Sequence, residues 1–223
     1  MSAIEQNQPN GEAALALVAI ACSAGALGPL RDVVGSLPRG FPAAVVIAQH
    51  LGGWSVLPQI LANDTELPVT FADAGETLHA GTIYVCPPKY HIAIAPDARI
   101  MLSARERLQF IRPSADWLFE SAAAVYGDRA IGVVLSGMRN DGAYGASRIK
   151  RAGGRVIVQD PRSTMYGEMP AAAAAAAAAT SGGADFILPP RDIGDALVEV
   201  VQQMNVEAGR DAWERPFVPQ STK

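Results

Sequence analysis

Residues 15–28 read L-A-L-V-A-I-A-C-S-A-G-A-L-G, an uncharged apolar run that ends at a serine followed by small residues. Three more runs have few charges, as in parallel strands covered on both faces: 43–50, 131–136 and 155–159. Between several of these runs the apolar residues have helical spacing, at 27–37, 55–62, 114–126 and 143–152. Strands alternating with helices predict an α/β protein, a three-layer α/β/α, doubly wound domain with a mostly parallel sheet.

The middle of the chain has a different pattern. Short apolar runs follow one another closely, separated by turn residues, at 69–72, 82–86, 91–95 and 100–103. Close spacing of this kind is typical of antiparallel hairpins. We therefore expect a small antiparallel insertion at one edge of the sheet.

Residues 171–179 are nine consecutive alanines. Pro170 precedes them and two glycines follow, as expected at the start and the end of a helix. Because alanine has the highest helix propensity, we predict a helix rather than a linker. Its small side chains favour close packing on the sheet, and a surface helix is the alternative.

The composition is that of an ordinary globular protein. Of 223 residues, 49% are hydrophobic and 18% charged, which excludes disordered, collagen-like and coiled-coil chains. With 18 Lys and Arg against 22 Asp and Glu, the net charge is −4, and a broad cationic surface for nucleic acid is not expected. We expect one domain over 15–204, with a flexible N-terminal tail at 1–14 and a C-terminal tail at 205–223.

The cysteines and the start of the chain bear on location. Cys22 and Cys86 lie near the ends of apolar runs without metal-binding spacing, and we interpret them as reduced core residues. Residues 1–14 lack a basic segment, and no apolar run approaches the roughly 20 residues of a membrane span. These features predict a cytoplasmic protein without membrane insertion. No feature of the sequence indicates an oligomeric state.

Three polar residues follow predicted strands. Ser23 and His50 stand at the ends of apolar runs, and Asp141 lies in the G-M-R-N-D-G-A segment after the run at 131–136. In a doubly wound sheet the carboxyl ends of the strands face one crevice. A hydroxyl, an imidazole and a carboxylate are therefore expected on the same rim.

This set of groups suits nucleophilic catalysis. A serine becomes nucleophilic when an imidazole takes its proton, and a carboxylate fixes the tautomer of that imidazole. The small residues after Ser23 lead into a helix start, whose backbone donors suit an oxyanion. Singly, each residue has a plainer interpretation: a helix cap for Ser23, a structural imidazole for His50 and a turn residue for Asp141. Their joint placement favours the catalytic interpretation.

The sequence gives weaker signals for other chemistries. His79 lies in a turn-rich stretch and His91 in the predicted hairpin, where loop and edge-strand roles are expected. No cluster of His, Cys and carboxylate residues has metal-ligand spacing. The turn S-A-G-A-L-G has Ser23 at the first glycine position of a dinucleotide-binding loop, and His50 stands where an acidic ribose ligand is expected. We therefore expect no metal and no cofactor.

Several motifs together resemble the CheB-type protein-glutamate methylesterase catalytic domain. They are V-A-I-A-C-S-A-G-A near the start, V-V-I-A-Q-H, R-P-S-A-D-W-L-F at 112–119, G-V-V-L-S-G-M-R-N-D-G-A at 132–143, and a final G-x-M-P. The resemblance covers about residues 16–200, with the motifs in the family's order. The order Ser, His, Asp along the chain also differs from that of α/β-hydrolases.

The resemblance implies a function and a set of roles. Ser23 is the implied nucleophile, His50 the general base and Asp141 the third triad member, with the backbone N–H groups of Met138 and Ala24 forming the oxyanion hole. The implied reaction is hydrolysis of glutamate γ-methyl esters on the cytoplasmic helices of chemoreceptors through an acyl-enzyme. Deamidation of receptor glutamines is a related activity.

The chain departs from the family pattern near the predicted site. The family usually has S-T-G-G where this chain has Ala24 and Ala26, and glycine at the positions of Arg139 and Glu168. Three interpretations of Arg139 remain: exposure to solvent, pairing with Glu168 or Asp141 that narrows the site, or attraction of an acidic substrate surface.

The resemblance also leaves alternatives for the whole chain. We expect a catalytic unit without the receiver domain that commonly precedes it, and therefore no control through a fused receiver.

Because a net charge of −4 gives little global steering of the substrate, Arg112 and Arg139 are expected to recognise substrate locally. The alternatives are a catalytically impaired binding or regulatory module of this fold, and a serine esterase of this fold with another substrate.

Overall fold

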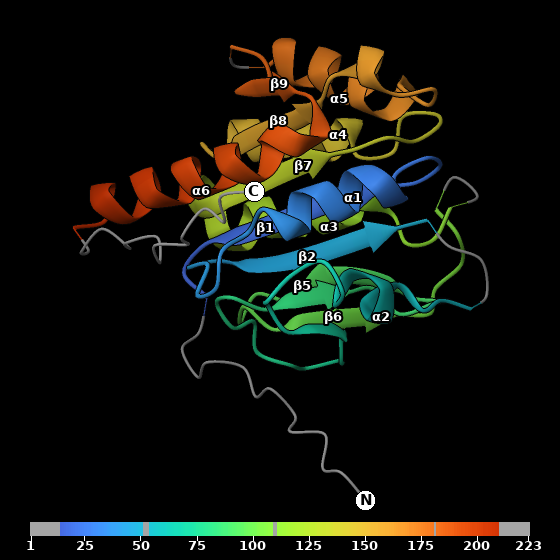
Figure 1. The fold of residues 1–223 in the computed structure, drawn as a ribbon, viewed down its shortest axis with the longest axis vertical. Coiled ribbons are helices and arrows are strands. Elements are labelled where there is room, and N and C mark those ends of the chain that lie inside the picture. Colours follow the sequence, from blue (N-terminus) through green and yellow to red (C-terminus); the bar gives the residue numbers. More distant parts are fainter. Residues whose placement is uncertain (1–13, 51–53, 109–110, 181, 210–223) are drawn as a thin grey trace, which may run out of the picture.

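Seven strands form one parallel sheet in the computed structural model, which describes residues 14–50, 54–108, 111–180 and 182–209 (Figure 1). In spatial order they are β3 (Val69–Phe71), β4 (Ile83–Val85), β2 (Ala44–Gln49), β1 (Leu17–Cys22), β7 (Ala130–Val134), β8 (Arg155–Gln159) and β9 (Phe186–Leu188). Every residue of β1 is fully buried, as its apolar sequence predicts for a central strand.

Helices cover both faces of this sheet (Figure 1). One face packs against α1 (Leu27–Gly35), α2 (Leu57–Leu61) and α6 (Pro190–Glu207), and the other against α3 (Ala115–Tyr126), α4 (Ala143–Arg151) and α5 (Glu168–Ala178). Successive residues of β1 alternate between the two apolar cores, with Leu17 in one and Val18 in the other. Short 3₁₀ turns occur at Gly127–Arg129 and Pro161–Ser163. The predicted three-layer α/β/α fold is confirmed.

The direction of winding reverses between β1 and β7. From β1 the chain builds outward through β2 towards β3, and it then continues on the other side of β1 from β7 to β9. Ligand sites of doubly wound sheets lie outside the carboxyl ends of the strands at such a reversal. The loops after β1 and β7 meet there, since the Ser23 N–H donates to the Ser136 carbonyl oxygen at 2.9 Å.

The predicted antiparallel insertion is correct only in its second half. β5 (His91–Ile94) and β6 (Ile100–Ser103) form a separate antiparallel pair, which packs on α3. The runs at 69–72 and 82–86 contain β3 and β4, which pair in parallel at the edge of the main sheet, so that part of the prediction was wrong. All three residues of β4 are buried, and an exposed hairpin would leave this apolar surface uncovered.

The alanine-rich segment forms α5, as predicted. Ala173 and Ala177 are fully buried with Met169, whereas Ala171 and Ala175 are exposed. The helix therefore packs closely on the sheet through one face. At the other predicted boundary, α6 extends to Glu207, three residues into the expected C-terminal tail at 205–223. Residues 1–13 and 210–223 of the predicted tails lie outside the described residues.

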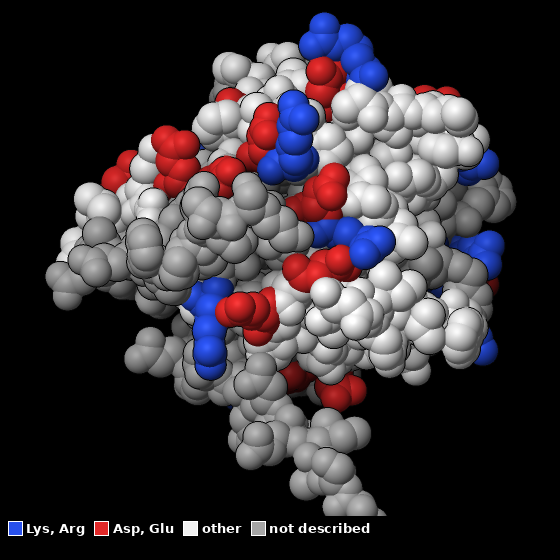
Figure 2. Space-filling model, in the orientation of Figure 1, with Lys and Arg blue, Asp and Glu red and all other residues white. Residues whose placement is uncertain are grey.

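The structure also shows the surroundings of the two cysteines and the distribution of surface charge. Cys22 and Cys86 are free and buried, and burial raises the pKa of each thiol to about 12. Acidic and basic side chains are interspersed over the face shown in Figure 2, which shows no extended cationic surface. Among the residues that the structure describes, no helix combines the length and apolarity needed to cross a bilayer.

Candidate active site

Ser23 lies in a tight turn directly after the central strand β1. The Ala26 N–H donates to the Ser23 carbonyl oxygen at 3.2 Å, and Gly25 within the turn has a φ of 72°. A Cβ at Gly25 would lie 2.7 Å from Cδ2 of Tyr166, so both the conformation and the contact require glycine. Ser23 is half-buried, and its hydroxyl has no hydrogen-bond partner in the described part of the chain. The turn presents an uncommitted hydroxyl at the rim.

His50 lies beside Ser23 because the strands that carry them are paired. Cys22 stands opposite Gln49, and the His50 N–H continues this ladder by donating to the Cys22 carbonyl oxygen at 3.0 Å. The imidazole Nε2 lies 2.8 Å from Oδ2 of Asp141. When Nε2–H donates to this carboxylate, Nδ1 is left with the lone pair that can take a proton.

The N-terminus of α3 holds the Asp141 carboxylate. Oδ2 accepts the Ala115 N–H at 2.7 Å, and Oδ1 accepts the Asp116 N–H at 3.1 Å and the Ser114 hydroxyl at 3.3 Å. These donors and the positive end of the helix dipole compensate the burial of Asp141, of whose side chain 4% is exposed. They also fix the orientation of the carboxylate towards His50.

A second histidine supports this helix start. His91 is fully buried, its Nδ1 accepts the Ser114 backbone N–H at 3.0 Å, and its Nε2 lies 3.1 Å from the Glu106 carbonyl oxygen. Since Nδ1 accepts and Nε2 donates, the ring is neutral, and burial lowers the pKa of His91. The expected edge-strand position is correct, but the link to Ser114, 23 residues away, had no signal in the sequence.

The loop after β7 packs directly on the Ser23 turn. The Gly137 N–H donates to the Tyr166 carbonyl oxygen at 2.8 Å, and the Met169 N–H donates to the Gly137 carbonyl oxygen at 3.0 Å. A Cβ at Gly137 would lie 2.9 Å from the Cβ of Ser23 and would also collide with the Met169 side chain. Glycine at this position is therefore what lets the loop approach the serine so closely.

Two backbone donors at this contact have no acceptor. Within the described residues, nothing accepts a hydrogen bond from the N–H of Ala24 or of Met138. The next N–H along the chain, that of Arg139, donates to Oε2 of Glu168 at 2.6 Å. Two open N–H donors beside a serine are the arrangement that an oxyanion hole needs.

The two arginines expected to recognise substrate differ in their surroundings. Arg139 is exposed, and its guanidinium has no ion pair with any residue that the structure describes. Its contact with Glu168 runs through the backbone and is not the charge pair that would narrow the site. Arg112 is half-buried, and its Nη1 donates to the carbonyl oxygens of Ala104 at 3.2 Å and Arg105 at 3.0 Å. Arg112 therefore holds the segment that leads into α3.

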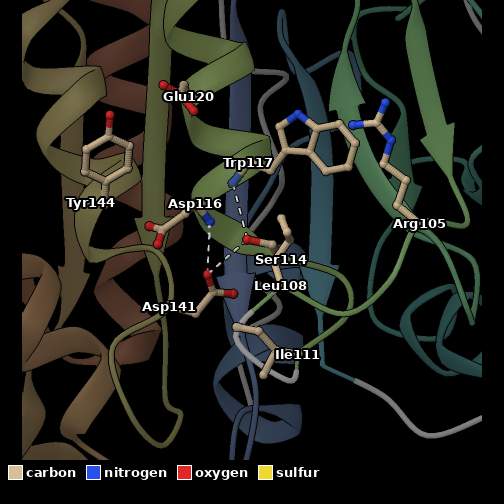
Figure 3. Close-up of a pocket in the computed structure, with 9 residues that line it drawn as sticks. All are labelled: Arg105, Leu108, Ile111, Ser114, Asp116, Trp117, Glu120, Asp141 and Tyr144. Atoms are coloured by element: carbon tan, nitrogen blue, oxygen red, sulfur yellow. Dashed lines mark hydrogen bonds between the residues drawn. The ribbon is translucent and has the colours of Figure 1, made fainter.

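A pocket of about 580 Å³ opens beside the first turns of α3 (Figure 3). Figure 3 shows Trp117 and Arg105 on one side of this helix and Tyr144 on the other. The pocket reaches Asp141, but neither Ser23 nor His50 is among its described lining residues. It therefore adjoins the site on the side of the carboxylate.

Asp116 is the second carboxylate at this helix start. Burial raises its pKa to about 6 and the neighbouring Asp141 adds to the rise, whereas a hydrogen bond from the Gly145 N–H opposes it. Across the described residues, no group of three or more His, Cys, Asp and Glu side chains could hold a metal ion.

Comparison with known proteins gives a consistent family assignment. The family model described as CheB methylesterase matches residues 18–197. A Leptospira interrogans protein assigned as a protein-glutamate methylesterase/protein-glutamine glutaminase is 35% identical over 195 residues, which cover 85% of this chain and 96% of that protein. The protein-glutamate methylesterase FrzG of Myxococcus xanthus is 38% identical over 187 residues, 83% of this chain and 54% of FrzG, so the chain spans about half of that relative.

A solved structure agrees with the sequence relatives. The crystal structure of the Thermotoga maritima CheB methylesterase catalytic domain matches with a TM-score of 0.77 and 30% identity, covering 83% of this chain and 98% of that domain. The match of the family model to most of the chain, together with these relatives, shows that the chain belongs to the CheB methylesterase family.

Proposed function

We propose that this protein hydrolyses γ-methyl esters of glutamate side chains in the cytoplasmic helices of chemoreceptors, with deamidation of receptor glutamines as a related activity. The observation that carries this proposal is the His50–Asp141 hydrogen bond at 2.8 Å on the rim where β1 presents Ser23. The names of the relatives, protein-glutamate methylesterase and protein-glutamine glutaminase, supply the substrate class. A substrate of this kind places the protein in the cytoplasm.

Acylation of the enzyme is the first half of the reaction. The Ser23 hydroxyl turns towards Nδ1 of His50 and gives up its proton as Oγ attacks the ester carbonyl carbon. Asp141, which accepts a hydrogen bond from Nε2–H, stabilises the imidazolium. The tetrahedral intermediate then loses methoxide, which takes the proton from Nδ1 and leaves as methanol. Ser23 now carries the glutamyl acyl group.

Deacylation repeats these roles with water. Nδ1 takes a proton from water as its oxygen attacks the acyl carbon, and Ser23 leaves with that proton as the free hydroxyl. In both halves the oxyanion accepts hydrogen bonds from the N–H groups of Met138 and Ala24. Removing a single donor of this kind typically costs about 10²- to 10³-fold in rate.

The exposed surface around the rim supports a protein substrate. Trp54, Met138 and Met165 lie in loops that follow β2, β7 and β8, and 78%, 52% and 89% of these residues is exposed. Large exposed apolar side chains in loops on the same rim as Ser23 suit a surface that binds another protein. Arg139 in the same region supplies a local positive charge for the carboxylate-rich methylation segment of a receptor.

The test compares methanol release from methylated receptor by the wild type and by Ser23→Ala. We expect release to fall to the uncatalysed rate in the variant. Ser36→Ala serves as the matched control, because Ser36 lies at the far end of α1 with its hydroxyl on the Asp32 carbonyl oxygen. Equal release by wild type and Ser23→Ala refutes the proposal.

The same experiment separates the alternatives. A fluorophosphonate that labels Ser23 while receptor methyl esters stay intact would assign a serine esterase with another substrate. Receptor binding without labelling and without methanol release would assign a binding module.

A further inference from the structure

Arg139 has an unfavourable backbone conformation in the loop that carries Met138. Its φ is 67°, in the left-handed region where a side chain clashes with the backbone and where glycine is favoured. Without an external partner, a residue other than glycine tends to leave this region. Because Arg139 directly follows Met138, such a change would displace the Met138–Arg139 peptide, which adjoins the Gly137–Met138 peptide that carries the open N–H.

Glu168 supplies the external partner. Its Oε2 accepts the Arg139 N–H at 2.6 Å, a charge-assisted hydrogen bond that is stronger than one to a neutral acceptor. Glu168 is the first residue of α5, an 11-residue helix, so its carboxylate also lies at the positive end of the helix dipole. This placement keeps the carboxylate turned towards the loop although the residue is exposed.

The loop is thus anchored on both sides of Met138 by consecutive residues of α5. Met169 binds the Gly137 carbonyl oxygen through its N–H at 3.0 Å, and Glu168 binds the Arg139 N–H through its side chain. The Met138 N–H between these anchors has no acceptor in the described part of the chain. Of the two anchors, only that of Glu168 depends on a side chain.

We propose that Glu168 is a positioning residue for the oxyanion hole. Its carboxylate holds Arg139 in the left-handed conformation and thereby aims the Met138 N–H at the oxygen of the carbonyl group whose carbon Ser23 attacks. This inference rests on the proposed hydrolytic function. Glu168 itself touches no reacting atom, and its effect on the reaction passes through the Arg139 peptide.

A double-mutant cycle tests the coupling between the two residues. In Glu168→Ala we expect kcat for methanol release to fall about tenfold with KM within about twofold, less than the loss of a whole oxyanion donor. Glu168→Gln should stay within about threefold of the wild type, because its amide oxygen still accepts the N–H. In an Arg139→Gly background, Glu168→Ala should change kcat less than about twofold, since glycine adopts a positive φ without strain.

The outcomes have distinct meanings. A Glu168→Ala enzyme with wild-type kcat overturns the proposal, as does an equal loss in both backgrounds, and a loss confined to KM would assign Glu168 to substrate contact instead. Thermal melting of each variant checks folding, and Glu168→Ser replaces Glu168→Ala if the latter melts early. Phosphonylation of Ser23 provides a second readout that requires no receptor, because the phosphonyl oxygen uses the same donors. When the double-mutant cycle is measured by the rate of Ser23 phosphonylation, it tests the role of Glu168 even if the receptor is the wrong substrate.

Discussion

Replacing Asp141 by Asn removes the charge that links His50 to α3 while keeping the side-chain shape. In the native protein Oδ2 accepts from both His50 and Ala115, and Oδ1 accepts from both Asp116 and Ser114. The amide nitrogen of Asn must take the place of either Oδ1 or Oδ2. In the first place it faces the Asp116 N–H and in the second the Ala115 N–H, so that two donors face each other in both cases. One N–H at the start of α3 therefore loses its acceptor, and the imidazolium loses its counter-charge in either orientation.

The expected magnitudes follow from these contacts. A buried N–H without an acceptor costs about 1–3 kcal/mol of unfolding free energy. A hydrogen bond to a charged partner contributes about 1.5–3 kcal/mol, so its loss in the transition state lowers kcat about 10- to 150-fold. If the amide nitrogen faces Nε2, the imidazole tautomer reverses and Nδ1 no longer accepts the proton, and comparable substitutions then lower kcat by about 10⁴.

Urea unfolding and methanol release measure the two effects separately. Asp185→Asn is the matched control: Asp185 accepts from Lys150 Nζ at 2.8 Å and from the Val156 N–H at 2.7 Å, at the opposite end of the sheet. We expect the control to lose stability but to keep its kcat. An Asp141→Asn enzyme with kcat within threefold of the wild type would refute the assigned role of the carboxylate.

Three further changes test the surroundings of the site. His91→Phe leaves the Ser114 N–H without an acceptor and should cost about 1–3 kcal/mol in urea unfolding. Because the pKa of His91 is lowered in the folded state, wild-type stability should fall as the pH drops below about 6.5, and the variant should lose that part of the pH dependence. The pKa of Asp116 is raised from 3.8 to about 6, so the contribution of its protonated form to stability is present below pH 3.8 and is lost as the pH rises to about 6. The Tm of Asp116→Asn should therefore rise relative to that of the wild type across this pH range. A Tm difference between the two proteins that stays constant over the range would contradict this. Gly137→Ala, whose Cβ would lie 2.9 Å from that of Ser23, should abolish methanol release, and an active variant would show that the loop tolerates displacement.

The features predicted correctly from the sequence rest on local pattern. Residues 17–22 and 44–49 are uncharged because both faces of these strands are covered, and this pattern identifies central strands in any sequence. The rule that carboxyl ends of parallel strands meet on one rim is the basis for expecting Ser23, His50 and Asp141 together. Ser23 and His50 directly follow β1 and β2, whereas Asp141 lies in a loop seven residues after the end of β7, where the start of α3 holds it.

The features that were missed depend on contacts between distant segments. β3, β4 and β9 have only three residues each, too few for a pattern to distinguish parallel from antiparallel pairing. A charge pair between Arg139 and Glu168 was one of the three interpretations of Arg139, but the hydrogen bond in the structure runs instead from the Arg139 backbone N–H, in a conformation that arginine does not favour on its own. No local pattern encodes the form of such contacts.

The central claim is that Ser23, activated by His50 and Asp141, forms an acyl-enzyme. Its most direct test is acid quenching of the reaction with a methylated receptor peptide during the first turnovers, followed by mass spectrometric mapping of the protein. We predict a peptide adduct on Ser23 that accumulates with the first equivalent of methanol and is absent in His50→Gln. Methanol released at the wild-type rate with no adduct at any point of the time course, or an adduct on a different residue, would contradict the claim.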